Sequence, residues 1–155
     1  MVTVKMHIAL YQPDIPQKLG SILRLCACLG VTCHIIEPCG FILDDKRLKR
    51  VAMDYAEQAH YVRHVSWEQF ITSARGQAAR IVLLTTKARH SCYDFSFMSS
   101  DILLLGRESA GVPQSVAEVA DARIGIPMTP PARSLNIAQA ASMALGEALR
   151  QTRWK

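Results

Sequence analysis

Three short segments of this 155-residue chain hold polar side chains where a folded protein could use them for chemistry. The last of them, residues 126–136, carries Arg133, Ser134 and Asn136 just before a long periodic stretch. The start of a helix needs only one polar cap for its unpaired N–H groups. Three polar groups exceed that need, so we expect this segment to bind a ligand as well as to begin a helix.

The second segment, GRESAGVP at residues 106–113, directly follows an apolar run. Gly106 and Gly111 permit a close approach of the backbone to a ligand, where N–H and C=O groups can pair with the edge of an adenine. A tight turn before a helix is the alternative interpretation. That turn does not explain why Arg107 and Glu108 follow a buried strand.

The first segment along the chain, PDIPQKLGSILR at residues 13–24, follows the first predicted strand and carries Lys18 and Arg24. In an open α/β sheet, ligands bind at the carboxyl ends of the strands. We therefore expect all three segments at one edge of the sheet.

Several familiar sites are missing from the sequence. It has no G-x-G-x-x-G, no Walker A loop and no G-x-S-x-G turn, so neither common phosphate site nor a nucleophilic Ser134 is indicated. The five cysteines form no C-x-x-C pair, and we expect neither a disulfide framework nor a metal site. Cys26 and Cys28 are expected to fill the core. No apolar run approaches the ~20 residues of a membrane span.

The elements that must position these segments alternate along the chain. Apolar and β-branched runs predict strands, and i, i+3, i+4 spacing predicts helices. The predicted strands are residues 2–11, 32–38, 80–86, 101–106 and 123–128; the predicted helices are 19–29, 45–59, 67–75 and one that starts at 137. Such alternation predicts one α/β domain over residues 1–155, with a mostly parallel sheet and helices on both faces.

The closing helix has the clearest periodicity of the chain. Its apolar face consists mainly of alanine: Ile137, Ala140, Ala141, Ala144, Leu145, Ala148 and Leu149. Small side chains allow close packing, so we expect this helix in a confined space or at a dimer interface.

Lys and Arg total 18 against 13 acidic residues, which gives a net charge of +5 and a pI near 9.1. Such an excess indicates a polyanionic partner such as nucleic acid, or simply a basic surface.

The three segments, in this order, resemble the motifs of the SPOUT superfamily of RNA methyltransferases. The motif-bearing stretches are PDIPQKLGSILRLCACLG, LLLGRESAGVP and IPMTPPARSLNIAQAA. The match is closest to the small tRNA 2′-O-methyltransferases that act on the wobble nucleotide, cytidine or modified uridine 34, and it covers residues 9–151. The resemblance implies a deep C-terminal trefoil knot, a homodimer and S-adenosylmethionine as the cofactor.

The resemblance also implies roles for individual residues. The cofactor contacts would come from Leu84, Gly106, Ile126 and Ser134, and the catalytic residues would be Arg24, Glu108, Ser134 and Asn136. Guanidinium rarely deprotonates, so we expect Arg24 to bind a phosphate and stabilise the developing alkoxide rather than to act as the base. RNA contacts are expected from Lys18, Arg24, Lys46, Arg47, Lys49 and Arg50, with Arg63 and His64 as weaker candidates. The alternative for residues 46–50 is a solvated helix face.

The first motif departs from the family at two positions, where Lys18 and Ser21 replace asparagines. A catalytically weakened RNA-binding homologue is therefore an alternative to an enzyme, and a methyltransferase acting on ribosomal RNA is another. The chain begins directly with its first strand, so we expect a compact tRNA enzyme in the cytoplasm.

Overall fold

A computed structural model of the chain describes residues 5–52 and 59–154. Six parallel strands form one sheet in the order β3-β2-β1-β5-β4-β6. The strands are β1 (His7–Tyr11), β2 (Thr32–Ile36), β3 (Tyr61–His64), β4 (Ile81–Leu84), β5 (Ile102–Leu105) and β6 (Ala122–Ile124). The helices are α1 (Pro16–Leu29), α2 (Asp45–Ala52), α3 (Trp67–Gly76), α4 (Gln114–Val119) and α5 (Ile137–Thr152).

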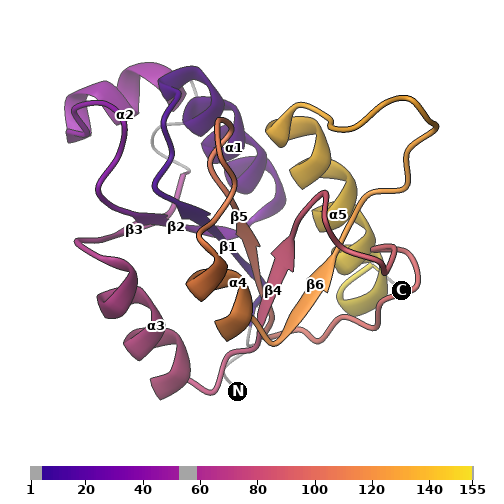
Figure 1. Cartoon of the computed structure of the whole chain (residues 1–155). Helices are drawn as coiled ribbons and strands as arrows, with labels where there is room; N and C mark the ends of the chain where they lie inside the picture. Colours follow the sequence, from indigo (N-terminus) through magenta and orange to yellow (C-terminus); the bar gives the residue numbers. More distant parts are fainter. Residues whose placement is uncertain (1–4, 53–58, 155) are drawn as a thin grey trace.

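Helices cover both faces of the sheet, as predicted (Figure 1). Alternate strand residues point to opposite faces: Ile8 and Leu103 pack with α1 and α5, whereas Ala9 and Leu104 pack with α3 and α4. The apolar strands are therefore buried on both sides. The strand order reverses between β1 and β5, which makes their carboxyl ends the expected place for a ligand.

Helix α1 begins at Pro16, before the predicted start at residue 19, because proline is well tolerated in the first turn of a helix. The same helix ends as predicted at Leu29, and the residue that caps it, Gly30, has a φ of 66° that suits glycine. Cys26 is buried as predicted, but the prediction for Cys28 is wrong because this residue is exposed. The predicted helix at 45–59 is present as α2, and residues 53–58 lie outside the described part.

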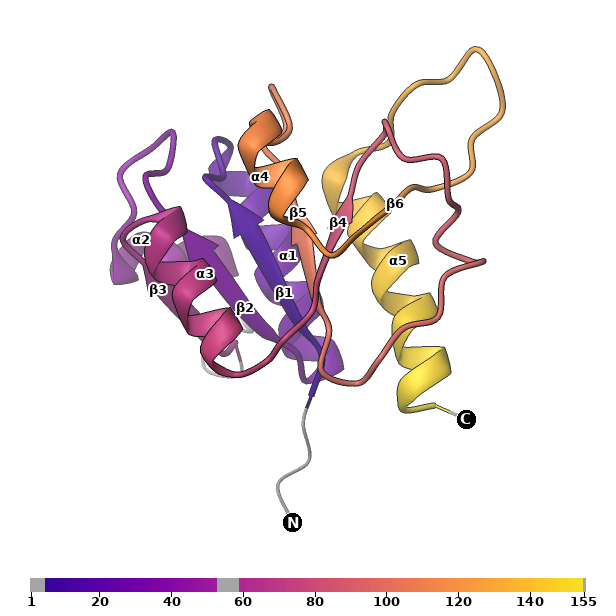
Figure 2. The same ribbon diagram turned by 60° about the horizontal axis from the view of Figure 1, so that its bottom comes forward.

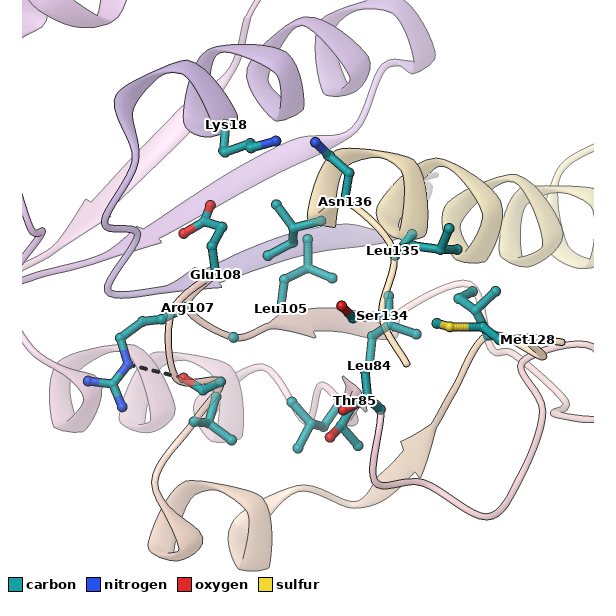
Figure 3. A pocket seen from close by; sticks show the side chains of 18 residues that line it. Lys18, Leu84, Thr85, Leu105, Arg107, Glu108, Met128, Ser134, Leu135 and Asn136 are labelled. Carbon is teal, nitrogen blue, oxygen red and sulfur yellow. Dashed lines mark hydrogen bonds between the residues drawn. The ribbon is translucent and has the colours of Figure 1, made fainter. Parts of the chain in front are cut away.

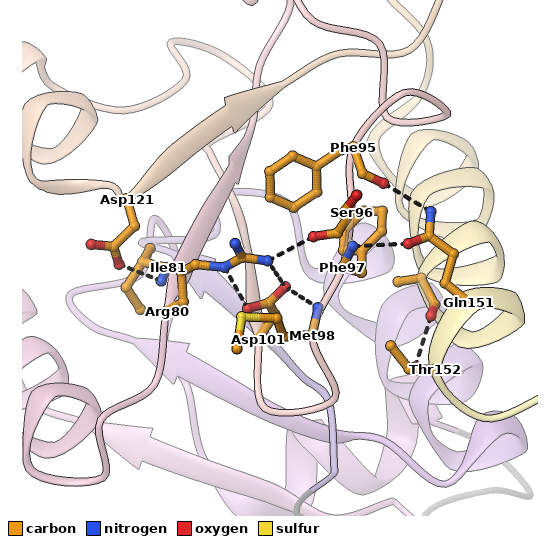
Figure 4. Close-up of polar contacts among 11 residues, drawn as sticks. Arg80, Ile81, Phe95, Ser96, Phe97, Met98, Asp101, Asp121, Gln151 and Thr152 are labelled. Atoms are coloured by element: carbon orange, nitrogen blue, oxygen red, sulfur yellow. Dashed lines mark hydrogen bonds and ion pairs between the residues drawn. The ribbon is translucent and has the colours of Figure 1, made fainter.

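The alanine-rich face of α5 is buried, as its periodicity predicted: Ala141, Ala144, Leu145 and Ala148 are fully enclosed. The chain between β4 and β5 runs beside this helix (Figure 2). The side chain of Gln151 accepts a hydrogen bond from the N–H of Phe97 and donates one to the carbonyl of Phe95 (Figure 4). These two bonds tie the β4–β5 connection to α5.

None of the helices within the described residues has the length and apolar character that a membrane crossing requires.

Candidate active site

A cavity of about 470 Å³ lies at the carboxyl ends of β4 and β5 (Figure 3). Its volume falls in the range of small-molecule sites. Apolar side chains and exposed backbone form most of the wall, and a few polar groups face the interior. The lining includes Leu83, Leu84, Thr85, Leu105, Gly106, Glu108, Ile126, Met128, Ser134, Leu135, Asn136 and Ala140.

The second and third segments meet at this cavity, and the first contributes Lys18. The four positions expected to contact the cofactor, Leu84, Gly106, Ile126 and Ser134, all lie in its wall. Their contact with a cofactor stays a prediction. Sequence reasoning missed Thr85, Met128 and Leu135, because nothing in their side-chain types marks them as ligand contacts.

The 106–111 loop owes its shape to a short backbone bridge. The N–H of Arg107 donates to the carbonyl of Gly111 at 3.0 Å, and the N–H of Gly111 donates back at 2.9 Å. A Cβ on Gly106 would lie 2.8 Å from backbone atoms of Gly111, so this position has no room for a side chain. Close packing of the two glycines therefore keeps backbone, rather than side chains, at the cavity wall.

Arg107 stabilises this loop and its attachment to the sheet. Its Nε donates to the carbonyl of Gly111 at 3.1 Å, and its guanidinium lies 5.5 Å from the ring centre of Tyr11. In Figure 3 this side chain points away from the cavity. The charge after the buried strand is thus explained by loop structure, whereas the neighbouring Glu108 faces the cavity.

Burial raises the pKa of Glu108 to about 7, and its hydrogen bond with Asp14 acts in the same direction. The carboxyl therefore gains or loses its proton near neutral pH, where a group that exchanges protons with a substrate is most effective.

Ser134 and Asn136 reach the site from the loop before α5. Asn136 is the N-cap of that helix, and its Oδ1 accepts a hydrogen bond from the N–H of Ala138 at 2.9 Å. The capping oxygen is occupied, so the amide NH₂ is the part of Asn136 that can serve the cavity. Figure 3 shows this amide facing the amine of Lys18, and the Ser134 side chain directed into the cavity.

The first segment contributes less than expected to this chain's own cavity. Lys18 lines it, but Arg24 is exposed on α1 and does not belong to the lining. Ser21, the second departure from the motif, is exposed and donates its hydroxyl to the carbonyl of Gln17.

The basic residues of α2 are exposed: Lys46, Arg47, Lys49 and Arg50. Arg47 lies 5.8 Å from the ring centre of Phe41 and donates to the carbonyl of Ile42. Of the weaker RNA candidates, Arg63 forms an ion pair with Glu37 at 2.9 Å. His64 is 5% exposed, so its selection as an RNA contact is wrong.

Asp14 was also missed by sequence reasoning, although it lies within the first segment and beside Glu108. Its position after a strand and between two prolines was the available signal. Among the residues described, no cluster of histidine, cysteine or acidic side chains could hold a metal ion.

The chain is similar to known RNA methyltransferases along nearly its whole length. A tRNA (cytidine(34)-2'-O)-methyltransferase of Beijerinckia indica subsp. indica is 57% identical over 93% of this chain and 90% of that protein. The enzyme of the same name from Escherichia coli K12 is 41% identical over 94% of this chain and 93% of that protein.

Solved structures are similar to it as well. A structure described as "Structural insights into the 2-OH methylation of C/U34 on tRNA" has a TM-score of 0.87 and 38% identity over 97% of both chains. The SpoU methyltransferase AviRb of Streptomyces viridochromogenes, in complex with the cofactor AdoMet, has a TM-score of 0.84 and 27% identity over 97% of this chain and 62% of that one.

A family model described as the SpoU rRNA Methylase family matches residues 5–146. Since this match covers nearly all of the chain and the relatives align over more than nine-tenths of it, the chain belongs to the SpoU rRNA Methylase family.

Proposed function

We propose that this protein is a tRNA methyltransferase that uses S-adenosylmethionine to methylate the ribose 2′-hydroxyl of the wobble nucleotide 34, a cytidine or a modified uridine. The observation that carries the proposal is the cavity between the 106–111 and 126–136 loops. It occurs in a chain with 57% identity to a tRNA (cytidine(34)-2'-O)-methyltransferase.

The residues present fit this cofactor. An adenine ring needs an apolar slot with backbone polar groups at its edge, and the wall supplies Leu84, Leu105, Ile126 and the tightly packed backbone at Gly106. S-adenosylmethionine supplies a methyl group on a sulfonium, which leaves as a neutral thioether and needs no acid. The protein must therefore orient the ribose and accept one proton.

Arg24 is proposed to bind the phosphate beside the reacting ribose and to stabilise the developing alkoxide. Its exposed place on α1, outside the cavity lining, suits a residue that serves the cavity of a second copy. We therefore propose a homodimer. Arg24→Lys keeps the charge but loses bidentate geometry, so full turnover by this variant would contradict the role.

We also propose that α5 completes a deep trefoil knot. The contacts that support it join the two long connections to each other and to the helix. The N–H of Cys92 donates to the carbonyl of Gly125 at 2.8 Å, and the N–H of Gly125 donates to the carbonyl of His90 at 2.9 Å. The side chain of Gln151 on α5 binds the 95–97 backbone.

A tRNA substrate also leads us to propose a cytoplasmic location.

Mass spectrometry of nucleosides from a deletion strain tests the function. We expect loss of a 2′-O-methyl group at tRNA position 34, and its return when purified protein and S-adenosylmethionine are added. Purified ribosomal RNA serves as the parallel substrate. Methylation of ribosomal RNA instead, or RNA binding without any methyl transfer, would replace this proposal with one of the two alternatives.

A further inference from the structure

Asp14 and Glu108 bring two carboxyl groups together where the strand order reverses. Asp14 follows β1 and Glu108 follows β5, and these neighbouring parallel strands end at the same edge of the sheet. Glu108 lines the cavity, whereas Asp14 is not among the lining residues and has no role in the proposed reaction.

Their oxygens need a proton between them. In the described part of the chain, Oδ1 of Asp14 and Oε2 of Glu108 are both buried and have no hydrogen-bond donor from another group. A hydrogen bond between the two side chains is a cause of the pKa shifts of both carboxyls, because it lowers the pKa of Asp14 and raises that of Glu108. Ionised carboxylates only accept, so one of the pair must be protonated to donate to the other.

Surrounding contacts assign the proton to Glu108. The hydroxyl of Ser109 donates to Oδ2 of Asp14, which favours the ionised form of Asp14. The hydrogen bond from Glu108 lowers the pKa of Asp14, whereas burial raises the pKa of Glu108 to about 7. As in other coupled acid pairs, one carboxyl keeps the charge and its partner keeps the proton.

Backbone packing holds Asp14 in this position. A Cβ on Gly40 would lie 2.8 Å from the Cβ of Asp14, and the N–H of Gly40 donates to the carbonyl of Pro13 at 3.0 Å. The loop after β2 therefore supports the loop after β1, and Asp14 has little room to move away from Glu108.

Two cationic side chains line the same cavity as Glu108. Lys18 and Arg107 both line the cavity, but Arg107 is directed away from it and Lys18 faces Asn136 (Figure 3). Ser134 and Asn136, which approach from the loop before α5, are uncharged. Asp14 is therefore the charged group whose hydrogen bond raises the pKa of Glu108.

We propose that Asp14 is a positioning residue that holds Glu108 as the proton acceptor for the ribose 2′-hydroxyl, an inference that rests on the proposed function. In the step, the ribose O–H bond and the methyl–sulfur bond break, and a bond forms between the ribose oxygen and the methyl carbon. The sulfur leaves with the electron pair of its broken bond. The proton goes to ionised Glu108, where the hydrogen bond to Asp14 stabilises it until solvent removes it.

The pair predicts a distinctive pH profile. Single-turnover methyl transfer should rise with pH to a midpoint near 7, because only ionised Glu108 accepts the proton. In Asp14→Asn the amide donates to ionised Glu108, so the midpoint should move at least one pH unit lower. The plateau rate should fall severalfold, since a weaker base accepts the proton less readily.

Two other variants frame this experiment. Glu118→Gln removes one carboxylate from α4 that contacts Gln114, so the charge change is the same and the midpoint should stay near 7. Glu108→Gln keeps a donor for Asp14, should fold normally, and should lose at least about a hundredfold in rate together with the midpoint. A wild-type midpoint in Asp14→Asn would overturn the inference, even if its rate were lower.

Carboxyl ¹³C NMR of the enzyme without RNA separates the pair from the reaction. The Glu108 signal, assigned from its loss in Glu108→Gln, should titrate near 7 in the wild type and lower in Asp14→Asn. An ordinary glutamate titration in the wild type would overturn the inference directly. The expected titration together with no methyl transfer to tRNA at any pH would count against the proposed function, not against the pair.

Discussion

Arg80 and Asp101 form a two-point ion pair just before β4 and β5 (Figure 4). Nε and Nη2 of Arg80 lie 2.8 and 2.7 Å from the two carboxylate oxygens. The Asp101 side chain is 1% exposed and also accepts from the N–H of Met98, while Arg80 donates to the carbonyl of Ser96. This pair fixes the end of the connection that runs beside α5.

Asp101→Ala should therefore destabilise the protein strongly, because it leaves the guanidinium of Arg80 and the N–H of Met98 without their acceptor. Removing one partner of a buried pair costs about 3 kcal/mol or more, which urea denaturation would measure. Arg150→Ala is the matched control, since Arg150 also forms an ion pair, with Glu147, but its side chain is 66% exposed. An equal loss in both variants would contradict the importance of burial.

A row of three histidines in contact with one another leads us to predict that the stability of the protein depends on pH. Nδ1 of His7 lies 2.8 Å from Nε2 of His34, and Nδ1 of His34 lies 2.9 Å from Nε2 of His64. Burial lowers the pKa of all three, that of His34 to about 4. Below pH 6.5 these histidines therefore bind protons more readily in the unfolded chain than in the folded protein.

The free energy of unfolding should consequently fall as pH drops from 6.5 towards 4, by on the order of 3 kcal/mol from His34 alone. Denaturation at a series of pH values would measure the slope. His34→Phe should flatten it, while His60→Gln, which changes an exposed histidine, should not. A wild-type slope in His34→Phe would show that other groups cause the pH dependence.

Gly106→Ala should weaken cofactor binding by tenfold or more, because the new methyl group would force the Gly111 backbone to move. Calorimetric titration with S-adenosylmethionine would measure the affinity. Gly76→Ala has nothing within 4 Å of the new methyl group at the end of α3 and should stabilise the protein by up to about 1 kcal/mol. Unchanged affinity in Gly106→Ala would mean that the cofactor does not depend on this loop.

The basic face of α2 should contribute to tRNA affinity. Replacing Lys46, Lys49 and Arg50 together by alanine should weaken tRNA binding about tenfold at physiological salt. It should also make the affinity less dependent on salt. The slope of the logarithm of the binding constant against the logarithm of the salt concentration should become shallower by about 0.9 or less for each phosphate that the variant no longer binds. Filter binding over a range of salt concentrations measures both quantities.

A second triple variant separates this face from overall charge. Lys5, Arg75 and Arg150 are also exposed, and their replacement by alanine removes the same net charge. An equal loss of affinity in both triple variants would favour the solvated-face interpretation of α2.

The fold could be predicted largely because its signals are local. The alternation of apolar runs and periodic stretches indicated the two-sided sheet, and the alanine face of α5 is visible in its spacing. Strand β3 was missed because it lies at the sheet edge and exposes Val62 and Arg63, which weakens its apolar pattern. Helix α4 is only six residues long and has too few turns to show a period.

The site was predictable only in part, for a different reason. Gly106, Ser134 and Asn136 lie in recognisable motifs, so their segments could be identified one at a time. The contact between Asp14 and Glu108 depends on β1 and β5 being neighbours in the sheet, and that order is not encoded in either loop. The exposed position of Arg24 likewise follows from how α1 packs on the sheet.

Substitutions at Asn136 should separate its role in capping α5 from its role in the reaction at the cavity. Its Oδ1 caps the helix, and its amide NH₂ faces the cavity beside Lys18. Asn136→Asp keeps a good capping acceptor and loses the donor, so stability should be retained while methyl transfer falls. Asn136→Ala loses both groups and should also lower the free energy of unfolding by about 1 kcal/mol.

Thermal denaturation and single-turnover methyl transfer on the same samples would measure the two effects. Ser142→Ala is a suitable control, because its hydroxyl donates to the carbonyl of Ala138 on the exposed side of α5 without lining the cavity. It should leave both quantities nearly unchanged. If Asn136→Asp retained full activity, the amide would have no part in the reaction, and Asn136 would matter only because it begins the helix that carries the cavity wall.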